Sequence, residues 1–139
     1  MDYEQFKIDS GQYWDIFLHT NQELLGRSYF WYKGEEEDLM EIPEVASLEL
    51  MVNGKRLQTA LTKLFHPDKF DYFSFNYRTT HLHFHVLPRY EHPRHFADRE
   101  FIDPEFGRTY HGKQQQLIPL EVLLGIKDRI AGRYLIQGR

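Results

Sequence analysis

The stretch 81-HLHFHVLPRY-90 places histidines at three alternate positions, with apolar residues between them. Successive side chains of a β-strand point to opposite faces of the sheet, so this alternation predicts a strand over 81–88. The histidines would share one face, and the apolar residues would pack on a hydrophobic core from the other. The two sets are His81, His83 and His85, and Leu82, Phe84 and Val86.

Three imidazoles on one face form a candidate site, because histidine is a nucleophile when neutral and a donor when charged. Two other interpretations are a solvent-facing strand whose histidines have no role, and a metal site. Strict register over three positions disfavours the first. Steps of about 6.6 Å along one straight strand suit a compact tetrahedral shell poorly. We therefore expect no bound metal here.

Composition narrows the class of protein. A chain of 139 residues predicts one domain, 1–139. The lack of cysteine excludes thiolate catalysis and thiolate zinc sites. A formal net charge of -4 disfavours nucleic-acid binding, which needs a basic face. No apolar run is long enough for a membrane helix and no signal peptide is recognised, so we expect no membrane partner and a cytoplasmic location.

The first half of the chain predicts a hairpin and a long helix. Aromatic-rich runs over 12–19 and 27–33, joined by the polar turn 20–26, are typical of paired strands. Apolar residues at helical spacing predict a helix over 44–65, stopped by His66-Pro67. Asn53-Gly54 weakens its middle and predicts a bend or a split there.

The second half predicts a further strand pair, a surface segment and a final helix. The run 70–77 is expected to pair with 81–88. The polar segment 91–111 reads as irregular surface chain, and 119–134 as an amphipathic helix. The predicted class is α+β, a small antiparallel meander sheet with one long and one C-terminal helix.

The run His81-x-His83-x-His85, followed by Pro88-Arg89, resembles the signature of the histidine triad family of nucleotide hydrolases and transferases. Leu25-Gly26-Arg27, a strand, a long helix and a strand before the triad follow that family's order. The resemblance covers the core motif region 12–90 and leaves the extension 91–139 to the local reading. It implies the histidine triad fold.

The resemblance implies a role for each histidine. His83 would attack the α-phosphorus of a nucleotide and form a covalent nucleotidyl-histidine, which water hydrolyses. His85 would hydrogen-bond a phosphate oxygen, and His81 would orient the cluster. Arg89 is a secondary candidate for neutralising phosphate; a surface role is the alternative.

The sequence also departs from the family pattern. Arg27 stands where many members have a fourth histidine, and a guanidinium cannot accept a hydrogen bond, so its expected role is electrostatic. The family's Gly-rich loop is replaced by a shorter segment without glycine, in which donors would have to come from Asn76, Arg78 and Thr79. Asn76 alternatively ends the preceding strand.

The resemblance implies that a polar residue of the early hairpin binds the ribose hydroxyls. The candidates are His19 and Asn21, and Asn21 is preferred. The alternative for Asn21 is a structural role in the turn. The implied substrates are dinucleoside polyphosphates, as in diadenosine polyphosphate hydrolases, or nucleoside phosphoramidates. No cofactor is required, and a divalent cation would bind only with the substrate. A homodimer is implied. The alternative function is a non-catalytic nucleotide-binding module.

Overall fold

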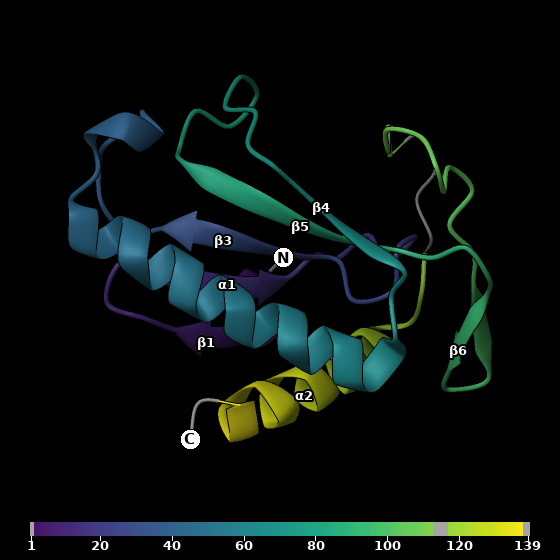
Figure 1. Cartoon of the computed structure of the whole chain (residues 1–139). Coiled ribbons are helices and arrows are strands. Elements are labelled where there is room, and N and C mark those ends of the chain that lie inside the picture. The colour runs from purple at the N-terminus through teal and green to yellow at the C-terminus, as the bar shows by residue number, and fades with distance from the viewer. Residues whose placement is uncertain (1, 113–116, 138–139) are drawn as a thin grey trace.

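The computed structural model describes residues 2–112 and 117–137. The predicted domain 1–139 and extension 91–139 also include residues 1, 113–116 and 138–139, which lie outside the described residues. Two layers make up the fold (Figure 1): a five-stranded antiparallel sheet, with α1 and α2 against one of its faces. The predicted α+β class is confirmed. Within the described residues no helix is long and apolar enough to cross a membrane.

The sheet has the order β1-β2-β3-β5-β4. Its first three strands form a meander, and the chain then crosses through α1 to the far edge before β5 returns to the centre. The strands are β1 (Lys7–Ser10), β2 (Trp14–Leu18), β3 (Ser28–Tyr32), β4 (Lys69–Phe73) and β5 (His83–Arg89), with a short 3-10 helix, η1 (Tyr3–Phe6), before them.

The predicted hairpin is confirmed as β2 and β3, in which Phe17 lies opposite Tyr29. The predicted pairing of the last two strands is also confirmed, with Phe73 opposite His85. β5 begins at His83, two residues later than expected, so His81 precedes the strand instead of lying in it. β1 was not predicted, because its four residues show no apolar alternation.

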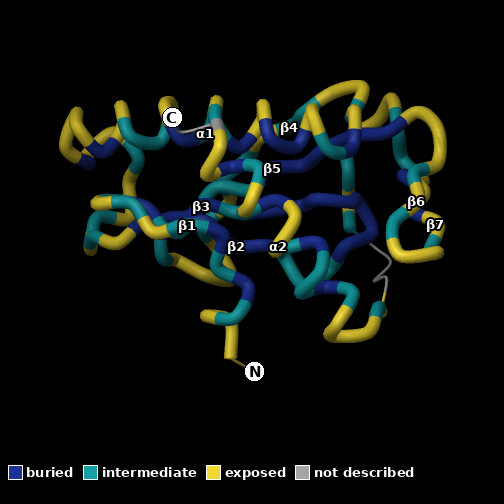
Figure 2. Tube along the Cα trace, turned by 90° about the horizontal axis from the view of Figure 1, so that it is seen from below, coloured by how far each residue is buried: buried dark blue, intermediate teal, exposed yellow. Residues whose placement is uncertain are grey.

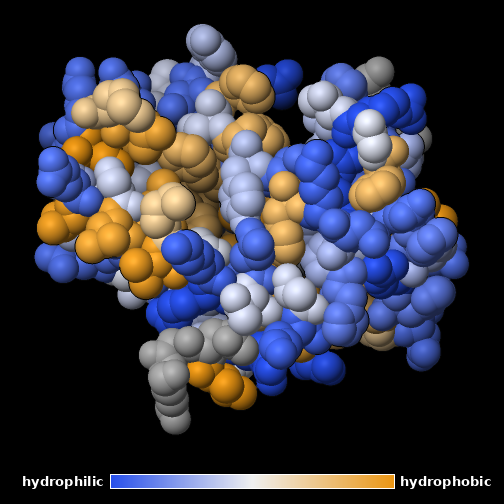
Figure 3. Space-filling model, viewed as in Figure 1, coloured by the Kyte–Doolittle hydropathy of each residue, from blue (hydrophilic) through white to orange (hydrophobic). Residues whose placement is uncertain are grey.

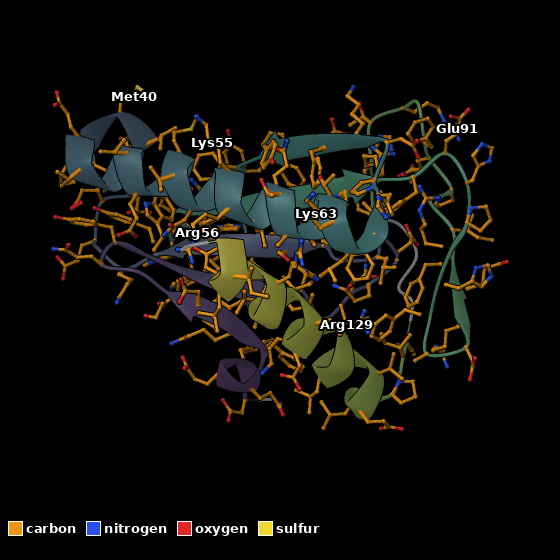
Figure 4. All side chains as sticks on the ribbon, turned by 60° about the horizontal axis from the view of Figure 1, so that its bottom comes forward. Met40, Lys55, Arg56, Lys63, Glu91 and Arg129 are labelled. Atoms are coloured by element: carbon orange, nitrogen blue, oxygen red, sulfur yellow. The ribbon has the colours of Figure 1, made fainter. Side chains whose placement is uncertain are left out.

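The long helix α1 (Glu44–Phe65) has the predicted bounds, and it is continuous through Asn53-Gly54. It follows a 3-10 turn, η2 (Leu39–Glu41). The C-terminal helix α2 (Leu120–Gln137) packs beside α1. Arg56 lies where the two helices meet (Figure 4), its guanidinium 3.9 Å from the ring centre of Tyr134 and its Nη2 donating to the Tyr134 carbonyl.

The core lies between the sheet and the helices, and the central strands β3 and β5 are mostly buried (Figure 2). Leu82 and Val86 face this core as predicted, and Phe84 is partly buried against it. The other face of β5 therefore points away from the helices. We call it the histidine face; it carries His83, His85, Leu87 and Arg89.

The segment 91–111 is more ordered than its composition predicts. A second, two-stranded sheet joins β6 (Arg94–Phe96) to β7 (Arg99–Phe101), and Phe101 and Asp103 are buried. The prediction of irregular surface chain was wrong for these residues, because polar side chains on a short two-stranded ribbon leave no period in the sequence.

Candidate active site

His83 lies at the start of β5 with its ring largely buried and one nitrogen fixed. Its Nδ1 is 2.8 Å from the backbone carbonyl oxygen of His81. A carbonyl oxygen only accepts, so Nδ1 carries the proton and the lone pair of the neutral ring resides on Nε2. Nε2 of His83 is therefore a nucleophile by its tautomer alone.

His81 supports His83 from the loop that precedes the strand. Its ring stacks on the indole of Trp31, with centres 4.2 Å apart and planes at 10°, and its Nε2 bonds the carbonyl oxygen of Tyr32. Ser74 Oγ donates to the His83 carbonyl at 2.5 Å. The ring of His83 is thus held by the His81 carbonyl, and its backbone by Ser74, which follows β4.

His85 and His19 complete a cluster of imidazoles. The ring centre of His85 is 5.1 Å from that of His83 and 5.9 Å from that of His19. Asn21 N–H donates to His19 Nδ1 at 3.0 Å, so the neutral His19 ring carries its proton on Nε2. His85 Nδ1 is buried and has no hydrogen-bond partner among the described residues.

Burial keeps both of these rings neutral. It lowers the pKa of His19 to about 3, and the positive charge of Arg27 adds to the effect, followed by His85 and His83. The pKa of His85 falls to about 4 by burial first and Arg27 second. Neither ring is a proton donor of the imidazolium type at neutral pH. As neutral rings they can still donate an N–H to a phosphate oxygen or a hydroxyl.

Arg27 supplies the cation of the cluster, and its placement depends on Gly26. The glycine has φ +89°, a conformation that strains other residues, and a Cβ there would lie 2.9 Å from Leu61 Cδ2 and force that side chain to move. The guanidinium of Arg27 is buried, its centre lies 5.5 Å from the ring of Tyr110, and its Nε has no partner among the described residues. Burial lowers the pKa of the Arg27 guanidinium, but the ordinary pKa of arginine is so far above neutral pH that the group stays charged.

A first cavity of about 470 Å³ opens beside His83 and His85, a size that suits a small-molecule ligand. Aromatic rings line most of it, and His19 and Thr79 add polar groups. Phe17 and Tyr29 stack with centres 5.3 Å apart. Rings of this kind can pack on a nucleobase. The aromatic lining residues are Tyr3, Phe17, Tyr29 and Trp31.

The other predicted binding residues differ in their position. Thr79 lines the first cavity, whereas Arg78 is exposed in the same loop and Asn76 Oδ1 accepts from Ser74 Oγ at 3.3 Å. Asn21 does not line the cavity; its Oδ1 accepts from Glu23 N–H at 3.0 Å, which is the turn role given as its alternative. His19, the second choice on the sequence, is the residue that the structure places there.

Arg89 is not placed at the histidines. It is 2% exposed, and its guanidinium binds both oxygens of Asp103, at 2.7 and 3.2 Å. It also donates to Asp71 and to the carbonyl oxygens of Glu105 and Arg108. The expectation that Arg89 neutralises phosphate is corrected, because its donors hold the segment after β7 in place.

No group of three or more histidine or carboxylate side chains among residues 2–112 and 117–137 is arranged to hold a metal ion. No protein-family model matches the sequence, and no curated protein matches it.

Comparison with solved structures decides the fold. The chain has the fold of histidine triad proteins. A histidine triad protein from Marinobacter aquaeolei superposes with a TM-score of 0.76 and 17% identity, over 94% of this chain and 88% of that one. One from Sinorhizobium meliloti gives 0.75 and 16%, over 96% and 95%. A hypothetical histidine triad nucleotide-binding protein from Sulfolobus tokodaii gives 0.69 and 16%, over 96% and 86%.

Proposed function

We propose that this chain is a histidine triad hydrolase or nucleotidyltransferase that cleaves nucleotides at the α-phosphorus through a covalent intermediate on His83. The observation that carries the proposal is the bond from His83 Nδ1–H to the His81 carbonyl, which leaves Nε2 as the free nitrogen. The fold of nucleotide-binding histidine triad proteins and the aromatic cavity beside His83 support it.

Two displacements at phosphorus make up the proposed reaction. The lone pair of His83 Nε2 attacks the α-phosphorus, and the bond to the leaving group breaks with its electron pair on the leaving group. A phosphate leaves as a stable anion, whereas an amine takes a proton from solvent as it leaves. The imidazole, still protonated on Nδ1, then carries a positive charge that the His81 carbonyl stabilises. Water attacks next, the phosphorus–nitrogen bond breaks, its pair returns to Nε2, and the water proton passes to solvent.

The side chains around His83 would bind the phosphate and the ribose of the nucleotide. Arg27 is a fixed positive charge beside His19 and His85 for the phosphate oxygens, and His85 would donate to one of these oxygens. His19 Nε2–H would bind a ribose hydroxyl or a phosphate oxygen. The nucleoside would occupy the first cavity. We propose dinucleoside polyphosphates or nucleoside phosphoramidates as substrates, with no required cofactor.

The test is nucleoside monophosphate release from diadenosine polyphosphate and adenosine phosphoramidate, followed by chromatography. In rapid-quench experiments at neutral or alkaline pH, intact mass should show a nucleoside monophosphate adduct that His83→Ala lacks. Acid quenching must be avoided, because bonds from phosphorus to imidazole are acid-labile. Saturable nucleotide binding without monophosphate release at high enzyme concentration would instead identify a non-catalytic binding module.

We further propose a homodimer in the cytoplasm. Side chains of η2 and the first half of α1 form an apolar patch (Figure 3), and each is 50 to 81% exposed. Tyr72 on the edge strand β4, bonded to Gln58 of α1, is a further exposed ring. The patch consists of Met40, Val45, Leu48, Met51 and Val52.

Sedimentation equilibrium tests the assembly. The wild-type chain should have the mass of a dimer, and Leu48→Lys with Met51→Lys should give a folded monomer, because two buried charges would oppose association. Lys63→Gln, at an exposed position on the second half of α1 (Figure 4), is the matched control and should remain dimeric. A monomeric wild type would contradict the proposal.

A further inference from the structure

We infer that a second cavity on the histidine face binds the leaving group, and that this group is a phosphorylated aromatic molecule such as a nucleoside phosphate. The inference rests on the proposed function and narrows its substrates. The cavity has a volume of about 830 Å³ and lies between β4 and the segment 106–111. The residues that carry the inference are Lys69, Phe73, Phe75, Arg108 and Tyr110.

The two cavities lie on either side of one stacked pair of rings, His85 and Phe73. Phe73 lies opposite His85 in the pairing of β4 with β5, so both side chains are on the histidine face. Their rings stack with centres 4.6 Å apart and planes at 19°. His85 lines the first cavity and Phe73 the second. A phosphorus atom bound at His83 and His85 would therefore have one cavity on each side.

Arg89 builds the wall of the second cavity. Its bonds to Asp103 and to the carbonyl oxygens of Glu105 and Arg108 fix the segment that faces β4. The same segment brings Tyr110 over Arg27. The buried guanidinium thus joins the histidine face to a part of the chain that the sequence predicted as irregular surface chain.

Two cations of this cavity have charge to offer an anion. The Lys69 side chain is 70% exposed, and its Nζ lies 3.9 Å from Asp71, a carboxylate that Arg89 also binds at 2.9 Å. Arg108 is exposed and donates Nη2 to the Pro104 carbonyl at 3.3 Å. The nearby acid Glu105 is bonded to His111. Phosphate oxygens could replace these weak or solvated contacts.

The aromatic residues of the cavity indicate a ring on the leaving group. Phe73 and Phe75 have ring centres 5.3 Å apart, and Tyr110 lines the same cavity from the segment 106–111. Phe75 is 66% exposed and is not part of the core. One exposed ring and two partly buried rings beside two exposed cations match a nucleobase that carries phosphates.

Leaving-group chemistry points the same way. When the bond from the α-phosphorus to a bridging oxygen breaks, its electron pair stays on a phosphate that is stable as an anion and needs no proton. An alkylamine would need one, and the low pKa values of His19 and His85 leave both rings without an imidazolium proton at neutral pH. Lys69 and Arg108 would stabilise the departing anion.

The experiment compares two substrates with the same adenylyl half. Diadenosine triphosphate releases ADP, and adenosine phosphorofluoridate releases fluoride, a small anion that also needs no proton. Lys69→Gln with Arg108→Gln should lower kcat/KM for the dinucleotide about tenfold, as expected for lost contacts to charged groups. Phe75→Ala should act in the same direction, and both should leave the fluoridate rate within about twofold.

Lys63→Gln is the matched control for loss of an exposed charge, and circular dichroism should show that every variant is folded. If the variants affect both substrates equally, or affect neither, the second cavity does not bind the leaving group. The proposed adenylyl transfer to water would still hold. If the wild type cleaves the fluoridate but not the dinucleotide, the inference fails and the proposed function is kept. If the wild type releases AMP from neither, the proposed function fails with it.

Discussion

The ring of His83 donates its Nδ1–H to the backbone carbonyl of His81, two residues earlier, at 2.8 Å. This bond sets the tautomer without any carboxylate, and His81 itself lies outside the strand. His81 is itself held by Trp31 and the Tyr32 carbonyl. The first histidine of the motif therefore acts through its backbone on the second.

His83→Ala should lower turnover by several orders of magnitude, as for other enzymes that lose a covalent catalyst. The fold should survive, because the core-facing Leu82 and Val86 are unchanged. Turnover at high enzyme concentration and thermal unfolding measure the two effects. A folded variant with the wild-type rate would exclude catalysis by His83.

Phe84→Ala is the matched control on the other face of the strand. Its ring packs edge-on against Trp14 with centres 5.9 Å apart, but it is only partly buried. The loss in free energy of unfolding should thus fall below the about 3 to 5 kcal/mol of a fully buried ring. Activity should change through the fold alone.

The predictable parts of this molecule are those with a period. Alternation predicted most of β5, and helical spacing with the stop at His66-Pro67 predicted α1. The same spacing could not tell that Leu48 and Met51 are exposed, because an apolar row is equally typical of a core and of an interface. β1 is too short for any period, and the bonds of Arg89 join residues far apart in the sequence.

The candidate site was predictable where one strand carries it and less so where elements meet. His83 and His85 follow from the motif. His19 comes from the end of β2, and its position beside His85 depends on the register of three strands. Its only sequence signal was nearness to the turn, which Asn21 shares. The second cavity depends on the segment 106–111, which no pattern placed.

His19 and His85 should remain neutral at pH 6, where an ordinary histidine of pKa 6.5 is mostly protonated. Burial and Arg27 lower their pKa values to about 3 and about 4. Nitrogen chemical shifts of the labelled rings from pH 7 to 4 measure this, with the urea-unfolded chain as reference. If the rings of His19 and His85 titrate near pH 6.5, the buried cluster is contradicted.

The lowered pKa values of His19 and His85 also predict that the protein becomes less stable in acid. The unfolded chain binds protons on these two histidines below about pH 6.5, and the folded chain does so only near pH 3 to 4. The unfolded state therefore binds more protons within that window, and the free energy of unfolding decreases as the pH falls through it. Urea unfolding at several pH values should show a smaller decrease for His19→Gln.

His19→Ala should raise KM for a nucleotide more than Asn21→Ala does. His19 lines the first cavity, whereas the Asn21 side chain accepts from Glu23 in the turn. Asn21→Ala should mainly lower the unfolding temperature. Steady-state kinetics and thermal unfolding of both variants separate the effects, and the reverse ranking in KM would restore Asn21 as the ribose ligand.

A chelator should leave activity on a substrate without a polyphosphate chain largely unchanged. The proposed nucleophile is an imidazole nitrogen, so no metal-bound water is needed. Divalent ions would act on a dinucleoside polyphosphate by pairing with its phosphates. Metal analysis and assays before and after chelation test this. Tightly bound stoichiometric zinc, with activity lost on removal and restored on return, would contradict the mechanism.

Arg27→Ala should lower turnover and raise the pKa of His85, because the variant removes the charge that opposes protonation of that ring. Arg27→Lys should restore the charge but only part of the turnover, since an ammonium lacks the planar fork that can bind two phosphate oxygens. Tyr110 packs over the guanidinium at 5.5 Å, a contact that suits the flat group better than a lysine. The titration of the His85 ring measures the effect of the charge at position 27, and the kinetics measure its effect on turnover. A variant that matches the wild type in turnover, KM and the His85 titration would reduce Arg27 to a structural residue at the start of β3.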